Sequence, residues 1–450
     1  MKDFTLAEIA KACNGEYVGD ESLKNTKITS VERDSRQIKD GSLFLAIKGE
    51  RVDGHDFIEK CFAQGAVCAL CEKAPENATK PCIVVPSTLD AVKKIGRAYR
   101  EKFDIPVIGI SGSVGKTSTK EMLYAVLSQR FKTHKTQGNL NNELGVPLTL
   151  LSMPEDTEAA VIEMGISDFG EMTRLSEMVQ PTICVLTIIG ECHLENLGDR
   201  DGVLKAKTEM FKNARENADF ILNGDDDKLS TVKTVNGKKP VFFGLDAKND
   251  FYAKNIKNSG DGKVLATLCF DNNNIDVKIP AIGTYMVTNA LAAAAAGKLL
   301  GLTDEEIANG VASYKTVGSR ANVINTGKIK IIDDCYNANP TSVRASLDTL
   351  SNLDGKKVAI LGDMKELGSE ELKLHFDTGV YAKSKGIGTV ITVGELAKEL
   401  AKGADGKAFD TIEDAKPEIL KTIKSGDVVL VKASHSMQFE NIVEFLKQNF

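Results

Sequence analysis

A glycine-rich turn in the first third of the chain has the residue types that bind phosphate. Residues 109–119 read Gly-Ile-Ser-Gly-Ser-Val-Gly-Lys-Thr-Ser-Thr, after an apolar run and before an amphipathic segment. The pattern predicts a strand, a tight turn and a helix N-terminus, where backbone N–H groups and the helix dipole stabilise phosphate. Lys116 can reach terminal phosphate oxygens, and the Thr117 hydroxyl can bind Mg²⁺. The turn therefore predicts binding of a nucleoside triphosphate.

The spacing of this turn differs from the common phosphate-loop pattern. That pattern has a glycine five residues before Gly115, where this chain has Ile110. The alternative is a glycine-rich turn with an incidental lysine, but Gly-Lys-Thr at the start of a well-formed helix argues against it. A kinase, a motor, a ligase and a switch protein all remain open on this turn alone.

Two side chains that can bind metal follow the next apolar strands. Glu163 ends the expected strand 159–163, and His193 follows the expected strand 182–189. Ligands bind outside the carboxyl ends of parallel strands, so we expect both side chains near Thr117. A lone histidine is more often structural, but a carboxylate and an imidazole after successive strands favour a metal site.

The elements that must position these residues predict an α/β fold. Apolar strands alternate with amphipathic helices from about residue 104 to 318, which indicates βαβ units and a mostly parallel sheet. Residues 251–282 interrupt this alternation and predict an antiparallel hairpin that turns at 271–274. A chain of 450 residues is too long for one core. We expect three domains: a small N-terminal α/β domain (1–84), a central P-loop domain with an antiparallel extension (85–318) and a C-terminal Rossmann-like α/β domain (319–450).

Composition limits the class of protein. The net charge of −6 argues against broad binding of nucleic acid or anionic membranes. The most apolar helix candidate, 286–302, contains Lys298 and is too short to span a bilayer comfortably. The N-terminus is charged where a signal peptide would be apolar, and the nine cysteines are scattered. Cys68 and Cys71 form the one close pair, without the partners of a zinc site. We expect a cytoplasmic monomer that neither binds nucleic acid nor inserts into membranes.

Further segments resemble the Mur ligase family, whose members use ATP to form amide bonds in peptidoglycan precursor synthesis. They are the shortened phosphate loop 111–118, the asparagine-rich stretch 138–147 and the pattern Ala206-Lys207-x-Glu209-x-Phe211. The resemblance covers nearly the whole chain, and it implies that ATP binds at the glycine-rich turn. The ATP-binding residues that it implies are Ser111, Gly112, Ser113, Val114, Gly115, Lys116, Thr117, Ser118, Asn289, Arg320 and Asp334.

The resemblance also implies Mg²⁺ and a modified lysine. Thr117 and Glu163 would bind the ion shared with the ATP phosphates. His193 would hold a second ion together with Lys207, whose carbamylation by CO₂ would turn a cation into an oxygen-donor anion. Without the family, Lys207 is interpreted as a solvated helix lysine. The catalytic residues implied by the resemblance are Lys116, Glu163, His193 and Lys207.

Other segments are similar to the substrate-binding parts of the family. Residues 34–36, 44–49 and 53–57 resemble the domain that binds the uridine diphosphate end of the acceptor, and residues 333–340 resemble the loop of the member that adds D-alanyl-D-alanine. The implied reaction joins D-alanyl-D-alanine to the C-terminal carboxylate of UDP-N-acetylmuramoyl-tripeptide through an acyl phosphate. The implied substrate-binding residues are Ser35, Arg36, Lys48, Asp53, His55, Asn139, Asn141, Asn142, Tyr336 and Asn337.

Two alternative functions remain open, and three residues depart from the family pattern. The sibling ligase that adds the third peptide residue has an Asp-Tyr-Ala-His loop and an arginine motif, and this chain has neither. A P-loop ATPase that moves a partner is the more remote alternative. Tyr285 and Met286 stand where the family often has histidine and asparagine, and His435 stands where arginine is common.

Overall fold

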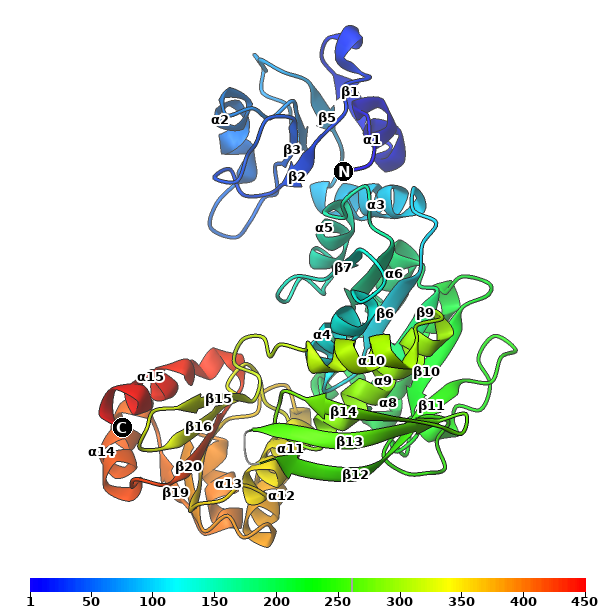
Figure 1. Ribbon diagram of the computed structural model, residues 1–450. Coiled ribbons are helices and arrows are strands. Elements are labelled where there is room, and N and C mark those ends of the chain that lie inside the picture. Colours follow the sequence, from blue (N-terminus) through cyan, green and yellow to red (C-terminus); the bar gives the residue numbers. More distant parts are fainter. Residues whose placement is uncertain (260–261) are drawn as a thin grey trace.

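The N-terminal part of the computed structural model, blue at the top of Figure 1, is a small α/β unit. The structure describes residues 1–259 and 262–450. The first elements are α1 (Leu6–Cys13), β1 (Glu16–Val18), β2 (Ser30–Glu32), β3 (Ser42–Leu45), α2 (Ile58–Ala63), β4 (Cys68–Cys71) and β5 (Cys82–Val84). The sheet order is β1-β5-β4-β3-β2, and every pair is parallel except β1 with β5.

The central part is a parallel six-stranded sheet with helices on its faces. Its elements are α3 (Thr88–Glu101), β6 (Val107–Ser111), α4 (Lys116–Leu127), β7 (Thr133–Lys135), α5 (Gly145–Leu151), β8 (Ala159–Glu163), α6 (Glu171–Val179), β9 (Ile183–Leu186), α7 (Leu194–Leu197), α8 (Arg200–Thr208), β10 (Asp219–Asn223) and β11 (Val241–Phe243). The order is β11-β10-β9-β6-β8-β7, and all the pairs are parallel. The expected alternation of strands and helices is confirmed.

An antiparallel extension covers one side of this sheet. It comprises β12 (Tyr252–Ser259), β13 (Lys263–Phe270) and β14 (Asn273–Ile279), followed by α9 (Tyr285–Leu299) and α10 (Asp304–Ala312). The expected hairpin is β13–β14, and its turn residues Asp271 and Asn272 have the positive φ angles of 44° and 63° that tight hairpins need. Residues 260 and 261 of the expected 251–282 region lie outside the described residues. Helix α9 is alanine-rich and buried along most of its length, because it packs against α4 and also contacts all three of these strands.

The C-terminal part is a second six-stranded α/β sheet, yellow to red in Figure 1. Its elements are β15 (Asn322–Asn325), β16 (Lys330–Asp333), α11 (Pro340–Ser351), β17 (Lys357–Gly362), α12 (Glu371–Ser384), β18 (Thr389–Val393), α13 (Ala397–Ala404), β19 (Lys407–Phe409), α14 (Ile412–Thr422), β20 (Val428–Lys432) and α15 (Glu440–Asn449). The order is β15-β16-β20-β17-β18-β19, and only β15 pairs antiparallel. The three-domain α/β class is confirmed.

Two differences from the expected elements lie close to the candidate site. Strand β9 ends at Leu186 instead of residue 189, because the following backbone turns to the glycine-rich loop, where Ser113 N donates to Ile188 O at 2.7 Å. The amphipathic pattern of residues 203–214 predicts one continuous helix, but the structure has α8 followed by a 3₁₀ turn, Glu209–Asn213. Both changes concern segments that carry predicted metal-binding residues.

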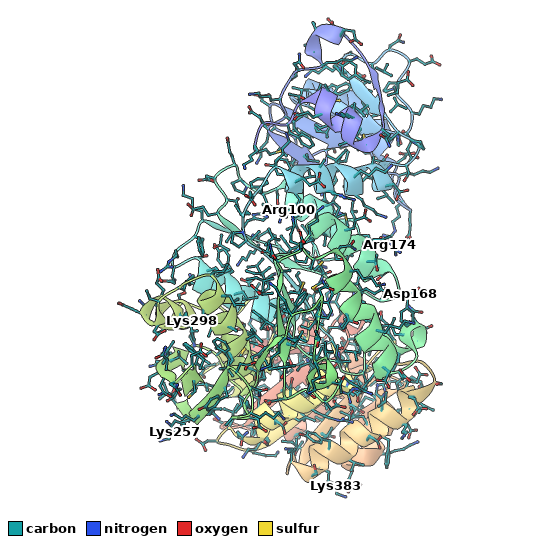
Figure 2. The ribbon with its side chains drawn as sticks, turned by 90° about the vertical axis from the view of Figure 1, so that its right-hand side faces the viewer. Arg100, Asp168, Arg174, Lys257, Lys298 and Lys383 are labelled. Atoms are coloured by element: carbon teal, nitrogen blue, oxygen red, sulfur yellow. The ribbon has the colours of Figure 1, made fainter. Side chains whose placement is uncertain are left out.

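The domains are joined by buried contacts. Helix α3 lies between the N-terminal and central parts (Figure 1), and Tyr99 packs in one apolar cluster with Phe4. Arg100, labelled in Figure 2, is buried in α3 and donates to the carbonyls of Val179 at 2.9 Å and Phe103 at 2.7 Å. Ile282, just before α9, packs in an apolar cluster of the C-terminal domain. Across the described ranges, no helix is long and apolar enough to cross a membrane.

Candidate active site

The glycine-rich turn links β6 to α4. Gly115 is the N-cap of α4 with φ +84°, a conformation that suits glycine. Gly112 has φ +150°, and a Cβ there would lie 1.9 Å from the hydroxyl of Thr187. Lys116 Nζ donates to the carbonyl of Gly112 at 2.8 Å, so the lysine folds back over the turn. The sequence thus forms the strand, turn and helix start that it predicts.

Side chains from β9 and its loop hold this turn in place. The Thr187 hydroxyl donates to the carbonyl of Val114 at 2.5 Å, and Ser113 Oγ donates to the carbonyl of Gly190 at 3.2 Å. Ser111 Oγ donates to the carbonyl of Met164 at 2.7 Å. Burial raises the pKa of the Tyr314 phenol, and the nearby hydroxyl of Ser118 partly offsets this shift. The hydroxyls of Ser111 and Ser113 therefore stabilise the loop in this structure.

Glu163 is the centre of the polar cluster below the turn. Its carboxylate accepts a hydrogen bond from Thr117 Oγ1 at 3.0 Å and from Asn141 Nδ2 at 2.8 Å, and only 1% of the residue is exposed. The structure therefore brings together three predicted site residues from β8, α4 and the asparagine-rich stretch. Asn142 Oδ1 instead accepts from the backbone N–H of Gly145 at 2.8 Å, and Asn139 is exposed.

A buried ion network next to Glu163 was not expected from the sequence. Lys120 Nζ lies 3.6 Å from Glu163 and 3.2 Å from Glu121, and its side chain is 1% exposed. Lys135 also pairs with Glu121. Lys120 follows the glycine-rich turn by one helical turn, but nothing in the pattern distinguishes it from a solvated helix lysine. Its role depends on β8, which brings in Glu163.

Lys116, His193 and Lys207 lie close enough for their charges to interact. Burial lowers the pKa of Lys116, and the charge of Arg320 lowers it further. Burial also lowers the pKa of His193, and the charges of Lys207 and Lys116 contribute to that shift. His193 therefore lies near the phosphate turn, as the order of the strands predicts, whereas the nearness of Lys207 was implied only by the family resemblance.

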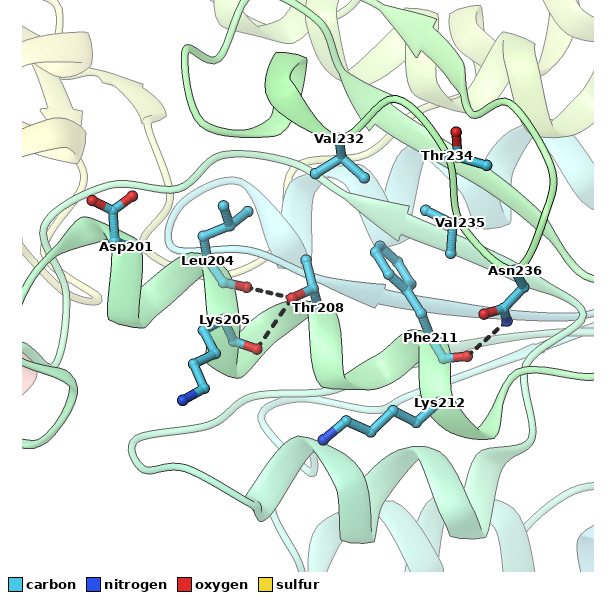
Figure 3. A pocket seen from close by; sticks show the side chains of 10 residues that line it. All are labelled: Asp201, Leu204, Lys205, Thr208, Phe211, Lys212, Val232, Thr234, Val235 and Asn236. Atoms are coloured by element: carbon cyan, nitrogen blue, oxygen red, sulfur yellow. Dashed lines mark hydrogen bonds between the residues drawn. The ribbon is translucent and has the colours of Figure 1, made fainter.

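Lys207 is buried instead of solvated, so the sequence-only interpretation is wrong. Its side chain is 1% exposed, and desolvation lowers its pKa to about 8. The other face of the same helical segment borders a cavity of about 500 Å³ (Figure 3). None of the predicted site residues lines this cavity. In its wall, Thr208 Oγ1 donates a hydrogen bond to the carbonyl of Leu204 at 2.8 Å. Lys207 does not line this cavity, and the interaction of its charge with Cys192 and Lys116 places it on the side of the phosphate turn.

The C-terminal domain contributes an aromatic and ionic group. The guanidinium of Arg320 lies 3.7 Å from the ring centroid of Tyr336, whose other neighbour is the ring of His435, with centroids 5.6 Å apart. Asp334 pairs with the buried Lys432 at 2.6 Å, and Lys432 also donates to the carbonyl of Asn337 at 3.0 Å. The family commonly has arginine at the position of His435. In this chain the ring of His435 stacks on Tyr336.

Asn289, from α9, contacts the first turns of α4, the helix that follows the phosphate turn. Its Oδ1 accepts from Thr119 Oγ1 at 3.0 Å, and its Nδ2 lies 3.4 Å from the sulfur of Met286. Tyr285 precedes this pair, and burial raises the pKa of its phenol well above the usual range. Two of the three departures from the family pattern therefore lie beside Asn289.

The N-terminal candidates lie in the loops after β2 and β3 and in the 3₁₀ turn Gly54–Phe57, within the unit at the top of Figure 1, away from α4. Exposed Arg36 forms a two-point pair with Asp34, with Nη2–Oδ2 at 2.7 Å, next to Ser35. Asp53 accepts from His55 Nδ1 at 2.6 Å, and its backbone bridges to Lys48. Because His55 Nε2 accepts from the backbone N–H of Glu72 at 2.9 Å, the proton of this ring is on Nδ1.

Comparisons with known proteins give the same family over the whole site. The chain matches the "Mur ligase family, catalytic domain" over residues 27–101, the "Mur ligase middle domain" over 110–297 and the "Mur ligase, glutamate ligase domain" over 319–435. It is 37% identical to the UDP-N-acetylmuramoyl-tripeptide–D-alanyl-D-alanine ligase of Bacillus subtilis (strain 168), with 98% of both chains covered.

Solved structures agree with the sequence relatives. A MurF crystal structure from Acinetobacter baumannii superposes with a TM-score of 0.92 at 32% identity and covers 100% of this chain and 99% of the other. MurF ligase from Thermotoga maritima in complex with ADP gives a TM-score of 0.84 at 30% identity and covers 93% and 97%. With this fold, this site and these relatives, the chain belongs to the Mur ligase family.

Proposed function

We propose that this protein uses ATP to join D-alanyl-D-alanine to the C-terminal carboxylate of UDP-N-acetylmuramoyl-tripeptide, through an acyl phosphate. The observation that carries the proposal is the contact of Glu163 with Thr117 and Asn141, which connects the phosphate turn to the asparagine-rich stretch. The name of the Bacillus subtilis relative, which matches over nearly the full length of both chains, supports this substrate pair.

The alternative is addition of the third peptide residue, but a solved diaminopimelate-adding ligase is only 16% identical, so that likeness concerns the fold alone.

The main obstacle in this chemistry is electrostatic. A carboxylate must approach a phosphate group, and two like charges about 4 Å apart repel by roughly 4 kcal/mol at an effective dielectric constant near 20. Lys116 lies at the N-terminus of α4 and folds over the turn, where it can offset that repulsion. The Thermotoga maritima relative was solved in complex with ADP, which supports nucleotide binding by this chain.

The donor atoms of the cluster suit Mg²⁺. The hydroxyl of Thr117 and the carboxylate of Glu163 are hard oxygen ligands, and His193 lies beyond the next strand. Among the described residues, no group of three or more His, Cys, Asp or Glu side chains is arranged to hold a metal, so a carbamate would add an anionic ligand that the unmodified side chains do not supply. Bound Mg²⁺ would neutralise the charge that develops on the transferred phosphoryl group.

Lys207 is the residue that would supply this anion as a carbamate. Carbamylation requires a neutral amine, because the lone pair of nitrogen attacks CO₂. A buried lysine with a pKa of about 8 is partly neutral near physiological pH, whereas an ordinary surface lysine is not. The burial of Lys207 therefore supports carbamylation, and the carbamate would complete the ligand set of His193.

The other domains supply the remaining binding groups. We assign residues 1–84, with Ser35, Arg36, Lys48, Asp53 and His55, to the uridine diphosphate end of the acceptor. We assign Arg320 and Asp334 to ATP, and Tyr336 and Asn337 to the dipeptide, within the domain 319–450. Asn139, Asn141 and Asn142 would line the path between the two substrates. A cytoplasmic location and a monomeric state remain predictions.

Phosphate release tests this proposal. With purified protein, ATP and Mg²⁺, release should require both the muramoyl-tripeptide nucleotide and D-alanyl-D-alanine. Turnover of the muramoyl-dipeptide nucleotide with a single free amino acid would instead indicate the sibling ligase. Release that needs no acceptor would indicate an ATPase. Either result overturns the proposal.

A further inference from the structure

A contact between the C-terminal and central domains reaches His193. Oε2 of Glu366, from the loop after β17, lies 2.6 Å from Nδ1 of His193, from the loop after β9. An ionised carboxylate only accepts hydrogen bonds, so Nδ1 must carry the proton. The lone pair of Nε2 is then left for another partner. The carboxylate of one domain thus selects the tautomer of a histidine in the other.

The backbone at both ends of this contact has an uncommon conformation. His193 has φ +51° and Glu366 has φ +66°, in the left-handed region that residues other than glycine seldom adopt. Such a conformation is unfavourable for a residue with a Cβ and persists only where the surroundings enforce it. Two strained residues that face each other across a domain interface indicate a specific contact.

Neighbouring contacts hold the two loops together. Thr341 Oγ1 donates to Glu191 Oε2 at 2.6 Å, two residues before His193. Gly368 packs on the backbone of Glu195, where an added Cβ would lie 3.2 Å from the nitrogen. Gly368 thus packs the loop of Glu366 against the segment after His193, and Thr341, at the start of α11, separately ties Glu191 to the C-terminal domain.

The loop that carries Glu366 is also anchored within its own domain. The backbone N–H of Met364 donates to Nε2 of the buried His375 at 2.9 Å, and that of Lys365 donates to Ser434 Oγ at 3.0 Å. A carboxylate on such a supported loop can orient an imidazole, whereas one on a free loop could not.

We propose that Glu366 is a positioning residue that fixes the imidazole of His193 from the C-terminal domain, with Nε2 directed to the metal. This inference rests on the proposed function, in which His193 binds Mg²⁺. It adds that the site in the central domain is complete only when the C-terminal domain is in place. A carboxylate that orients a metal-binding histidine typically changes metal affinity by about 10- to 100-fold when it is removed.

The experiment reads the tautomer directly in the full-length, metal-free protein. The chain has five histidines, so a ¹⁵N-histidine NMR spectrum can be assigned with single substitutions. We expect His193 to be protonated on Nδ1 in the wild type and on Nε2 predominantly in Glu366→Ala. Glu370→Ala is the matched control, because its side chain is as exposed as that of Glu366 (57% against 58%) but its carboxylate lies 3.7 Å from Lys373 and not against His193. An Nε2–H tautomer in the wild type, or an unchanged tautomer in Glu366→Ala, overturns the inference.

A second readout separates positioning from a purely structural role. In Glu366→Ala, the Mg²⁺ concentration for half-maximal ligation should rise about 10- to 100-fold, while KM for D-alanyl-D-alanine stays within about twofold. An unchanged Mg²⁺ requirement would overturn the inference. If the wild type itself fails to ligate, the proposed function fails, and the tautomer in the metal-free protein still decides whether Glu366 orients His193.

Discussion

The hydroxyl of Thr117 lies 3.0 Å from a carboxylate oxygen of Glu163, although 46 residues separate them in the chain. The contact joins the first turn of α4 to the end of β8, because β6 and β8 are parallel neighbours in the sheet. Two oxygen donors are thereby held at the mouth of a turn built to bind phosphate. This relationship supports the proposal that the region is a metal-dependent phosphoryl-transfer site and not only a nucleotide-binding turn.

Removal of the Thr117 hydroxyl tests this pair. Thr117→Val keeps the volume of a residue that is 5% exposed, so the fold should remain intact. We expect ligation to fall at least about 10- to 100-fold and the Mg²⁺ requirement to rise, because one oxygen donor is lost. Phosphate release over a Mg²⁺ titration measures both effects. Wild-type Mg²⁺ dependence would show that Thr117 binds no metal.

The buried Lys120 should be important for stability. Lys120→Met leaves Glu121 and Glu163 with an uncompensated buried charge, and the loss of one partner of a buried ion pair costs about 3 kcal/mol or more. Lys135→Met is the matched control, because Lys135 is 17% exposed and pairs only with Glu121 among the carboxylates that the structure describes. Urea denaturation should give the larger loss for Lys120→Met. Equal losses for the two variants would contradict the network.

The pKa of Lys207 predicts a pH-dependent stability. The folded value is about 8 and the usual value is 10.5, so the unfolded chain binds more protons between these limits and stability rises with pH there. Below pH 8 the unmodified folded protein holds a buried charge at a cost of about 3 kcal/mol. Without bicarbonate, Lys207→Met should therefore be more stable than the wild type at pH 7, and this difference should vanish by about pH 10.5.

Denaturation in degassed buffers at several pH values measures this difference. The same variant should lose ligation, and added bicarbonate should not restore it, because methionine cannot form a carbamate. A stability difference that stays constant with pH would contradict the burial of Lys207, and near-normal ligation would remove the carbamate proposal.

Gly112 should be required for the shape of the phosphate turn. In Gly112→Ala the new Cβ would lie 1.9 Å from the Thr187 hydroxyl, so the loop must move. We expect ADP affinity, measured by calorimetry, to fall about tenfold or more, equivalent to about 1.4 kcal/mol. Gly388→Ala is the control, because a Cβ added at Gly388 would have no atom within 4 Å. Equal ADP affinity in both variants would show that the loop tolerates a side chain.

The sequence predicts the interior of the fold well and its edges poorly. The central strands are continuous buried apolar runs, as in β6 and β8, and these were expected. Strands β1, β7, β11, β15 and β19 each lie at the edge of a sheet, have only three or four residues and lack a continuous buried apolar run that would predict them. Such short edge strands have no buried run of their own, because their pairing partner defines them.

The candidate site likewise contains some contacts that the sequence predicts and others that it does not. The proximity of Glu163 to Thr117 follows from the rule that strand ends in a parallel sheet share one edge. The burial of Lys207 could not be read from its helix, where charged neighbours suggest solvent, and was expected only through the family resemblance. The contact of Glu366 with His193 depends on how two domains pack, which no local pattern encodes.

The most direct test of the account follows an oxygen atom. UDP-N-acetylmuramoyl-tripeptide labelled with ¹⁸O in its terminal carboxylate is incubated with ATP, Mg²⁺ and D-alanyl-D-alanine, and the released phosphate is analysed by mass spectrometry. An acyl phosphate predicts one ¹⁸O atom in each phosphate, because the carboxylate oxygen leaves with the phosphoryl group when the amine attacks. Phosphate that contains only oxygen from ATP and water would contradict the proposed ligase mechanism.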